Sequence, residues 1–268
     1  MALHPVSHLG QSPGEHNPPS QHLRLYTLRE QIEHKAQCLD LLRERFPPET
    51  QYILMGHSMG TYVCAEVLKE RPEHNIATIV ALFPTLTHIA KTPNGVLLSP
   101  FFHPFLRTLV STCASALSLL PRPVLIPLVH LVTGQPEPGL SVTALKLLRG
   151  HVVNNALFMA GQEMEMIAEL DEAFYEEHVN KFVLYYGVGD AWAPEQHHRD
   201  MLEKFPDANI HLCEENVPHA FVLGHGEVMS RKVTGWLRGF WAVDGEDVEA
   251  VEEVRRANGV ATDGKKDV

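Results

Sequence analysis

A serine between glycines follows a short apolar run and precedes a helical pattern. The stretch reads QYILMGHSMGTY over residues 51–62, with the pentapeptide GHSMG at 56–60. A G-x-S-x-G pentapeptide between a strand and a helix is typical of a nucleophile elbow, a sharp turn that exposes the serine hydroxyl. This context restricts the fold, because the elbow needs a strand before the serine and a helix after it. Ser58 is therefore a candidate nucleophile, with an ordinary glycine-rich turn as the alternative.

The elbow also depends on the glycines and the backbone N–H groups beside Ser58. We expect Gly56 and Gly60 to leave room where a Cβ atom would clash with the adjoining strand and helix. The turn would also bring the backbone N–H of Met59 and the amino end of the following helix beside the hydroxyl of Ser58. These groups predict an oxyanion site.

Apolar runs and helical patterns alternate along most of the chain. Such alternation is typical of an α/β protein with a parallel sheet. The predicted strands are 52–55, 76–83, 181–186 and 209–213. The predicted helices are 26–45, a segment that follows Gly60 and ends before Pro72, 194–205, and 226–241.

Residues 84–180 interrupt this alternation as a long insertion. Its centre, 95–134, carries only two Lys, Arg, Asp or Glu residues, Arg107 and Arg122. The uncharged run 108–121 is shorter than the ~20 residues that span a bilayer, so a transmembrane helix is disfavoured. Two interpretations remain: a helical cap packed over the sheet, or an apolar lid that lies in a lipid interface. A cap could serve both purposes.

A serine nucleophile needs a base, and the base needs a carboxylate that orients it. In elbow-containing sheets these residues follow in the order Ser, acid, His. Asp190 follows the predicted strand 181–186 in the motif GVGD, and His219 follows the predicted strand 209–213 in the motif VPHA. Because the carboxyl ends of parallel strands meet at one edge of a sheet, we predict a triad of Ser58, Asp190 and His219.

Each member of this triad also has competitors. A lone histidine among 17 means little, and an aspartate after glycine is often only a turn residue. His57 could act as the base, but its place in the elbow is expected to point it away from Ser58. Other candidate histidines without a strand directly before them are His197, His198 and His225. The alternative carboxylates are Glu214 and Glu215.

Composition excludes several classes of function. The net charge of −11 disfavours a general affinity for nucleic acid. Four cysteines without a C-x-x-C pair predict no disulfide framework and no zinc site, so no metal and no cofactor are expected. The first residues lack the basic and apolar regions of a signal peptide. We therefore expect a reducing compartment.

The predicted organisation has three parts. Residues 1–22 are rich in Pro, Gly, Ser and His and are expected to be disordered. Residues 23–243 form the α/β domain, including the insertion 84–180. Residues 244–268 contain eight acidic and four basic residues and read as a solvated acidic tail.

Several motifs together resemble the lipid droplet-associated hydrolase family over roughly residues 31–241. They are REQIEHK (29–35), GHSMG (56–60), LFPT (82–85), TPNG (92–95), GQEM (161–164), YYGVGDAWAP (185–194) and CEENVPHAF (213–221).

The resemblance implies an α/β-hydrolase-type parallel sheet with an apolar helical cap insertion. It implies a serine esterase acting on lipid esters, with cholesteryl ester as a proposed substrate. Ser58 would be the nucleophile, Asp190 the acid and His219 the base. The insertion would bind the monolayer of a lipid droplet or the endoplasmic reticulum membrane from the cytoplasmic face.

The chain departs from the family pattern at one point. Family members carry a segment like PGNPG upstream of the elbow, and a loop there supplies the second oxyanion N–H. No such segment is found among the 57 residues before Ser58. We therefore expect the N-terminal strands to be missing and activity to be impaired, since losing one oxyanion donor lowers the rate by ~10²–10³. The alternatives are a catalytically weak or inactive lipid-droplet surface protein in lipid storage, and an acyltransferase that uses the same acyl-enzyme.

Overall fold

The structure, a computed structural model, describes residues 3–11 and 24–241 in two units, 1–220 and 221–268. The described part of the second unit contains a 3₁₀ turn, Phe221–Leu223, and helix α10, Gly226–Trp241. The sequence predicted this helix with the same bounds. Residues 1–2 and 12–22 of the predicted disordered segment and the predicted acidic tail, 244–268, lie outside the described residues.

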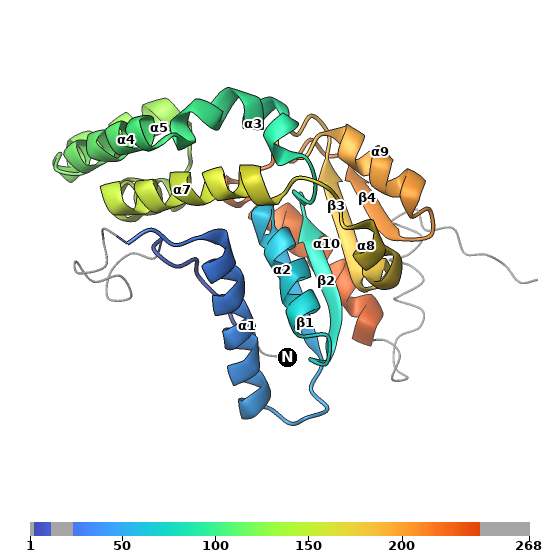
Figure 1. Ribbon diagram of the computed structural model, residues 1–268. Helices are drawn as coiled ribbons and strands as arrows, with labels where there is room; N and C mark the ends of the chain where they lie inside the picture. Colours follow the sequence, from blue (N-terminus) through green and yellow to red (C-terminus); the bar gives the residue numbers. More distant parts are fainter. Residues whose placement is uncertain (1–2, 12–23, 242–268) are drawn as a thin grey trace, which may run out of the picture. The chain divides into compact units, whose positions relative to one another are not determined.

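Four parallel strands form the sheet of the first unit as far as it is described, in the order β1-β2-β3-β4 (Figure 1). The predicted strands agree with the structure to within two residues at either end. The bounds are β1 Tyr52–His57, β2 Ile76–Leu82, β3 Phe182–Gly187 and β4 Asn209–Cys213. The parallel α/β class predicted from the alternation is confirmed.

Helices cover the sheet, and their apolar faces form the core. Helix α2 packs against β1 and β2 and against α1, and α9 packs against β3 and β4. Helix α1 begins with a capping box. The Thr27 hydroxyl accepts from the N–H of Glu30, and the Glu30 carboxylate accepts from the N–H of Thr27, so two N–H groups at the start of the helix are hydrogen-bonded. The bounds are α1 Leu28–Arg45, α2 Met59–Glu70, α8 Glu172–His178 and α9 Glu195–Lys204.

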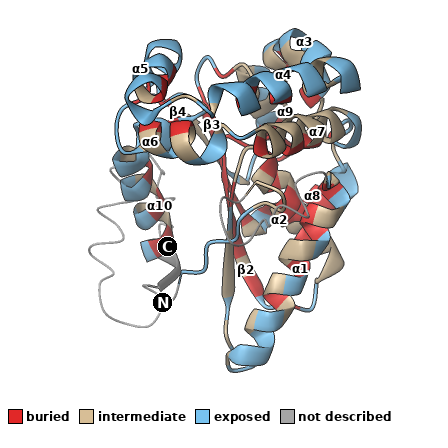
Figure 2. Cartoon of the chain, turned by 90° about the vertical axis from the view of Figure 1, so that its left-hand side faces the viewer, coloured by how far each residue is buried: buried red, intermediate tan, exposed pale blue. Residues whose placement is uncertain are grey.

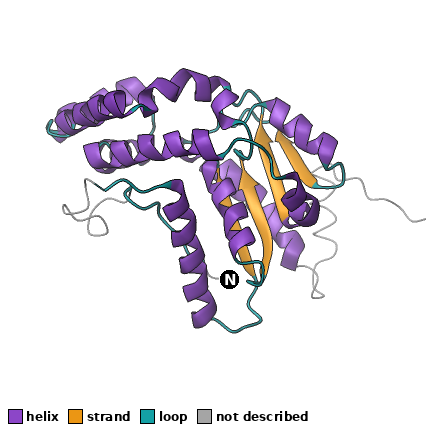
Figure 3. Cartoon of the chain, in the orientation of Figure 1, coloured by secondary structure: helices purple, strands orange, loops and turns teal. Residues whose placement is uncertain are grey.

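The insertion between β2 and β3 is helical and lies beyond the carboxyl ends of the strands (Figures 1 and 3). Helix α4 packs along α7, while α5, α6 and the turn after α6 bury a small apolar cluster of their own. The predicted α/β-hydrolase-type sheet with a helical cap insertion is therefore present. The bounds are α3 Pro93–Leu98, α4 Pro104–Leu117, α5 Arg122–Thr133, α6 Gly139–Val142 and α7 Gly150–Met166.

Many large apolar side chains of the insertion are exposed, and Figure 2 shows much of α3, α4 and α5 in the pale blue of exposed residues. Leu119, Leu131 and Val132 are 84%, 82% and 77% exposed. The interpretation of this segment as a cap packed over the sheet therefore accounts for only part of its apolar surface. None of the helices described for this chain combines the length and the apolar character that crossing a membrane requires.

Residues 3–11, which the sequence places in the disordered segment, lie against α1. The N–H of Leu9 donates to Oε1 of Gln31 at 2.9 Å, and the Gln31 amide donates back to the carbonyl of Leu9 at 3.0 Å. Lys35 donates to the carbonyl of Ser7 at 3.0 Å. This stretch contains no helix or strand but is held by side chains of α1.

Candidate active site

Ser58 sits at the turn between β1 and α2 with φ 54° and ψ −127°. A non-glycine residue rarely adopts a positive φ, and such strained residues gather at functional sites. The N–H of Ser58 donates to the carbonyl of Leu82 on β2 at 2.9 Å, and the carbonyl of Ser58 accepts from Thr61 at 2.9 Å. These bonds hold the strained turn between the sheet and the helix, as an elbow requires.

The two glycines of the motif serve different purposes. A Cβ atom on Gly56 would lie 2.4 Å from the carbonyl carbon of Gly60 and 2.5 Å from the N of Thr61, so only glycine fits there. A Cβ atom on Gly60 would meet nothing within 4 Å among the described residues. The expectation that Gly60 avoids a side-chain clash is therefore wrong. What the elbow needs at position 60 is a close approach of main chain to Gly56.

Three predicted side chains meet at the carboxyl ends of β1, β3 and β4. His219 Nε2 lies 2.8 Å from Ser58 Oγ, and His219 Nδ1 lies 2.6 Å from Asp190 Oδ2. Because a carboxylate only accepts, Nδ1 carries the hydrogen, and the neutral ring then offers a lone pair at Nε2 to the serine hydroxyl. This arrangement suits removal of the Ser58 proton.

Asp190 is held by more than its bond to His219. Its side chain is 1% exposed, and Oδ1 accepts from the N–H groups of Trp192 at 2.7 Å and Ala193 at 3.0 Å. Burial alone would raise the pKa of Asp190, but the bond and the charge of His219 and the two N–H groups outweigh it, so the pKa lies below its ordinary value. An aspartate that accepts N–H groups two and three residues on is a common turn device, so the turn role given above as the alternative for Asp190 is present beside its bond to His219.

The His57 ring contacts the main chain of His219. Its Nε2 lies 2.7 Å from the carbonyl oxygen of His219, a contact the sequence analysis did not foresee. Burial, followed by the charge of His219, lowers the pKa of His57 to about 4. A base with so low a pKa accepts a proton poorly near pH 7, so His57 is a poor candidate for the base.

The other competing residues lie elsewhere. His197 and His198 are on α9, where the ring of His198 packs edge-on to Tyr186. His225 is in the second unit. The side chains of Glu214 and Glu215 are exposed, whereas Asp190 is buried against His219.

Met59 is the first residue of α2, directly after Ser58. The first N–H groups of a helix have no acceptor within the helix, and they lie at its positive end. The position of Met59 is compatible with an oxyanion donor, and that role stays a prediction.

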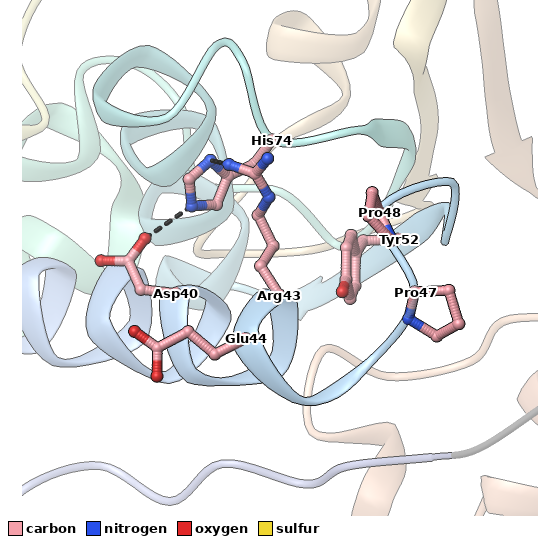
Figure 4. A pocket seen from close by; sticks show the side chains of 7 residues that line it. All are labelled: Asp40, Arg43, Glu44, Pro47, Pro48, Tyr52 and His74. Atoms are coloured by element: carbon pink, nitrogen blue, oxygen red, sulfur yellow. Dashed lines mark hydrogen bonds and ion pairs between the residues drawn. The ribbon is translucent and has the colours of Figure 1, made fainter.

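A pocket of 340 Å³ lies away from the triad (Figure 4). Tyr52, the first residue of β1, lines it, so it lies at the opposite end of that strand from Ser58. Asp40 and Arg43 both point at His74 (Figure 4). His74 Nε2 lies 2.5 Å from Asp40 Oδ1, and His74 Nδ1 lies 2.9 Å from a guanidinium nitrogen of Arg43. Because these polar groups satisfy one another, we assign this pocket no catalytic role.

Comparison with known proteins places the chain in a family. A family model described as lipid-droplet associated hydrolase matches residues 1–222. The lipid droplet-associated hydrolase of Rattus norvegicus is 35% identical over 215 residues, which cover 80% of this chain and 65% of the relative. That of Homo sapiens is 33% identical over 216 residues, with the same coverage of 80% and 65%. The chain thus spans about two thirds of the length of these curated relatives.

A solved structure agrees with the fold. It is a serine hydrolase from the bacterium Cycloclasticus zankles, with a TM-score of 0.53 at 17% identity, and the match covers 83% of this chain and 76% of that one. At this identity the likeness shows the fold alone. On the evidence of the family model and the relatives, the chain belongs to the lipid-droplet associated hydrolase family.

Proposed function

We propose that this chain carries the catalytic machinery of a serine esterase that hydrolyses lipid esters. The observation that supports this proposal most directly is the 2.8 Å contact between His219 Nε2 and Ser58 Oγ. It joins a strained, half-buried serine to a base whose other nitrogen is held by a buried carboxylate. Family membership and the names of the relatives agree with a hydrolase.

The proposed reaction forms an acyl-enzyme on Ser58 and then hydrolyses it. Ser58 Oγ attacks the ester carbonyl carbon while His219 Nε2 takes the hydroxyl proton. The carbonyl oxygen becomes an oxyanion, to which Met59 N–H donates. His219 then returns the proton to the alcohol oxygen as the ester bond breaks, leaving an acyl group on Ser58. Water, activated by His219, attacks this acyl-enzyme and releases the fatty acid, which restores Ser58.

Asp190 supports both steps. It holds His219 in the tautomer whose Nε2 is bare, and its charge stabilises the imidazolium that forms when His219 takes the proton. A carboxylate with a depressed pKa stays ionised at neutral pH, as this role demands.

We propose that the substrate is a water-insoluble lipid ester, with cholesteryl ester as one candidate, met at the cytoplasmic face of a lipid droplet or of the endoplasmic reticulum. The exposed apolar side chains of the insertion support this, since they lie on the segment beyond the carboxyl ends of the strands, where the triad also lies. An apolar surface of this kind favours a lipid interface.

A fluorophosphonate probe tests the catalytic proposal, because it reacts only with an activated serine. We expect the wild-type chain and a Ser99→Ala control, at an exposed serine of the insertion, to be labelled. Ser58→Ala should lose the label, and His219→Ala should react far more slowly. Labelling that persists in Ser58→Ala, or none in the wild type, overturns the proposal.

A second candidate function is that of a lipid-droplet surface protein without catalysis. The exposure of the insertion favours it, because binding to a monolayer needs no triad. Binding to artificial droplets by a wild-type chain that the probe does not label would support this second function. An acyltransferase would instead be labelled and would pass the acyl group to an added alcohol in preference to water.

A further inference from the structure

We infer that His57 is a positioning residue that holds the main chain of His219 through a single neutral tautomer. This inference rests on the proposed function, since it concerns the base of that reaction. His57 is the last residue of β1, directly before Ser58. Its Nε2 lies 2.7 Å from the carbonyl oxygen of His219.

The hydrogen in this contact has to come from His57. A carbonyl oxygen only accepts, so Nε2 of His57 must carry the hydrogen and donate it. The lowered pKa of about 4 keeps the ring neutral from pH 5 upward. A neutral ring with hydrogen at Nε2 has none at Nδ1, so one tautomer is selected.

His219 needs this support because its loop has no regular secondary structure of its own. The stretch after β4 contains no helix or strand, and Asn216 within it has a φ of 51°. A turn at residues 219–220 ends this stretch. Asp190 and Ser58 bond the ring of His219 at two points, neither of which holds its main chain directly. The bond from His57 supplies that third point.

The bond from His57 joins segments that are far apart in the sequence. Ser58 and His57 are covalent neighbours on the end of β1, while His219 lies 161 residues beyond Ser58. The bond therefore ties the backbone of the base to the strand that carries the nucleophile. Any drift of the loop away from β1 would lengthen the contact between Nε2 and Oγ.

The charge of His57 also matters during the reaction. The ring centroids of His57 and His219 lie 5.0 Å apart, and Phe83 packs against both rings at 6.2 Å and 6.0 Å. When His219 takes the serine proton, a protonated neighbour at this distance would oppose it. A neutral donor holds the loop without that repulsion. Trp192, centred 6.5 Å from the His219 ring, is uncharged as well, and Asp190 supplies the nearby negative charge.

Two substitutions separate the hydrogen bond from packing. His57→Gln keeps an N–H donor near the position of Nε2, while His57→Phe keeps a ring without a donor. With p-nitrophenyl butyrate as substrate, we expect His57→Phe to lower kcat by ~10²-fold with little change in KM, because displacement of a catalytic group by about 1 Å has such an effect. His57→Gln should restore most of kcat. The control is His34→Phe, a half-buried histidine on α1, which should leave kcat unchanged.

These outcomes decide the inference when the chain is active. Equal losses in the Phe and Gln variants would mean that the ring itself is needed, and an unchanged kcat in His57→Phe would mean that the bond does nothing. Either result overturns the inference while Ser58→Ala still tests the proposed function separately. Thermal unfolding of each variant identifies a loss that comes from misfolding.

Nitrogen-15 NMR of histidine-labelled protein provides a readout that needs no activity. The His57 signal, assigned by its absence in His57→Gln, should show hydrogen at Nε2 and a bare Nδ1 from pH 5 to 8. A signal that titrates near pH 6.5, or that shows the opposite tautomer, overturns the inference even if the wild-type chain hydrolyses no ester.

Discussion

Gly56 and Gly60 face one another with no room for a side chain on the first and open space around the second. The Cβ of an alanine at position 56 would lie 2.4 Å from the main chain of residue 60. We expect Gly56→Ala to destabilise the fold by about 3 kcal/mol or more, because the neighbour is backbone and cannot rotate aside. Urea unfolding measured by circular dichroism checks this expectation.

Gly60→Ala is the matched control, since it adds the same methyl group to the same motif. Gly60 lies in the first turn of α2, where alanine is the better helix former. We expect the free energy of unfolding to stay the same or rise by about 0.5–1 kcal/mol. If both variants lose stability equally, the elbow is packed differently from the structure described.

Much of this fold follows from pattern, and the reasons are local. The four strands are short, largely apolar runs that alternate with helical patterns, so the strands and their parallel pairing could be predicted. Ser58, Asp190 and His219 each follow one of those strands, and strand ends meet at one edge. Their meeting was therefore foreseeable, although their catalytic roles stay a prediction.

The parts that could not be predicted depend on contacts distant in sequence. The bond from His57 to His219 joins residues 162 positions apart and involves a carbonyl oxygen, which no residue pattern reveals. The burial of α5 against α6 but not against the sheet core depends on which face turns inward. Gly60 was misjudged because a motif shows that glycine is present but not which atoms stand near it.

Asp190→Asn should leave the site folded and nearly inactive. Asn Oδ1 can still accept from Trp192 and Ala193, so the turn should persist. The amide nitrogen would then face Nδ1 of His219 and favour the tautomer with hydrogen at Nε2, which cannot take the serine proton. We expect kcat for ester hydrolysis to fall by ~10⁴-fold, measured against p-nitrophenyl butyrate.

The controls for this substitution are Glu214→Gln and Glu215→Gln. Both side chains are exposed, and neither is expected to change kcat by more than about twofold if Asp190 orients the base. Full activity in Asp190→Asn, or a large loss in either glutamine variant, would assign the orienting carboxylate elsewhere.

Stability should fall as pH drops below 6.5, and His8 is one measurable cause. Burial, followed by the charge of Lys35, lowers the pKa of His8 from 6.5 to about 4. Between pH 6.5 and 4, His8 is therefore largely protonated in the unfolded chain and largely neutral in the folded chain. A falling pH favours unfolding in this range. Between pH 7 and 5, His8 should account for a loss on the order of 1–2 kcal/mol.

Urea unfolding at pH 7 and pH 5 measures this contribution. We expect His8→Leu to lose less stability between the two values than the wild type does. His225→Leu, at an exposed side chain, is the control and should follow the wild type. An equal pH response of His8→Leu and the wild type would show that His8 has the same pKa in the folded and the unfolded chain.

Binding to a lipid surface should depend on the outer face of α5. Val124, Leu128, Leu131 and Val132 recur at helical spacing on this face and are 52%, 36%, 82% and 77% exposed, while Leu125 and Val129 point into the small cluster with α6. Each apolar side chain that leaves water for a monolayer contributes ~1.5–3 kcal/mol, so losing two should lower affinity at least ~100-fold. We therefore expect Leu131→Glu with Val132→Glu to abolish flotation with triolein droplets coated in phosphatidylcholine.

The matched control is Leu41→Glu on α1, which is 63% exposed but lies outside the insertion and should float as the wild type does. Because all three side chains already face water, thermal unfolding of both proteins should stay close to that of the wild type. A double variant that still floats would remove α5 from the lipid-binding surface, and equal losses in both proteins would mean that added negative charge alone prevents binding.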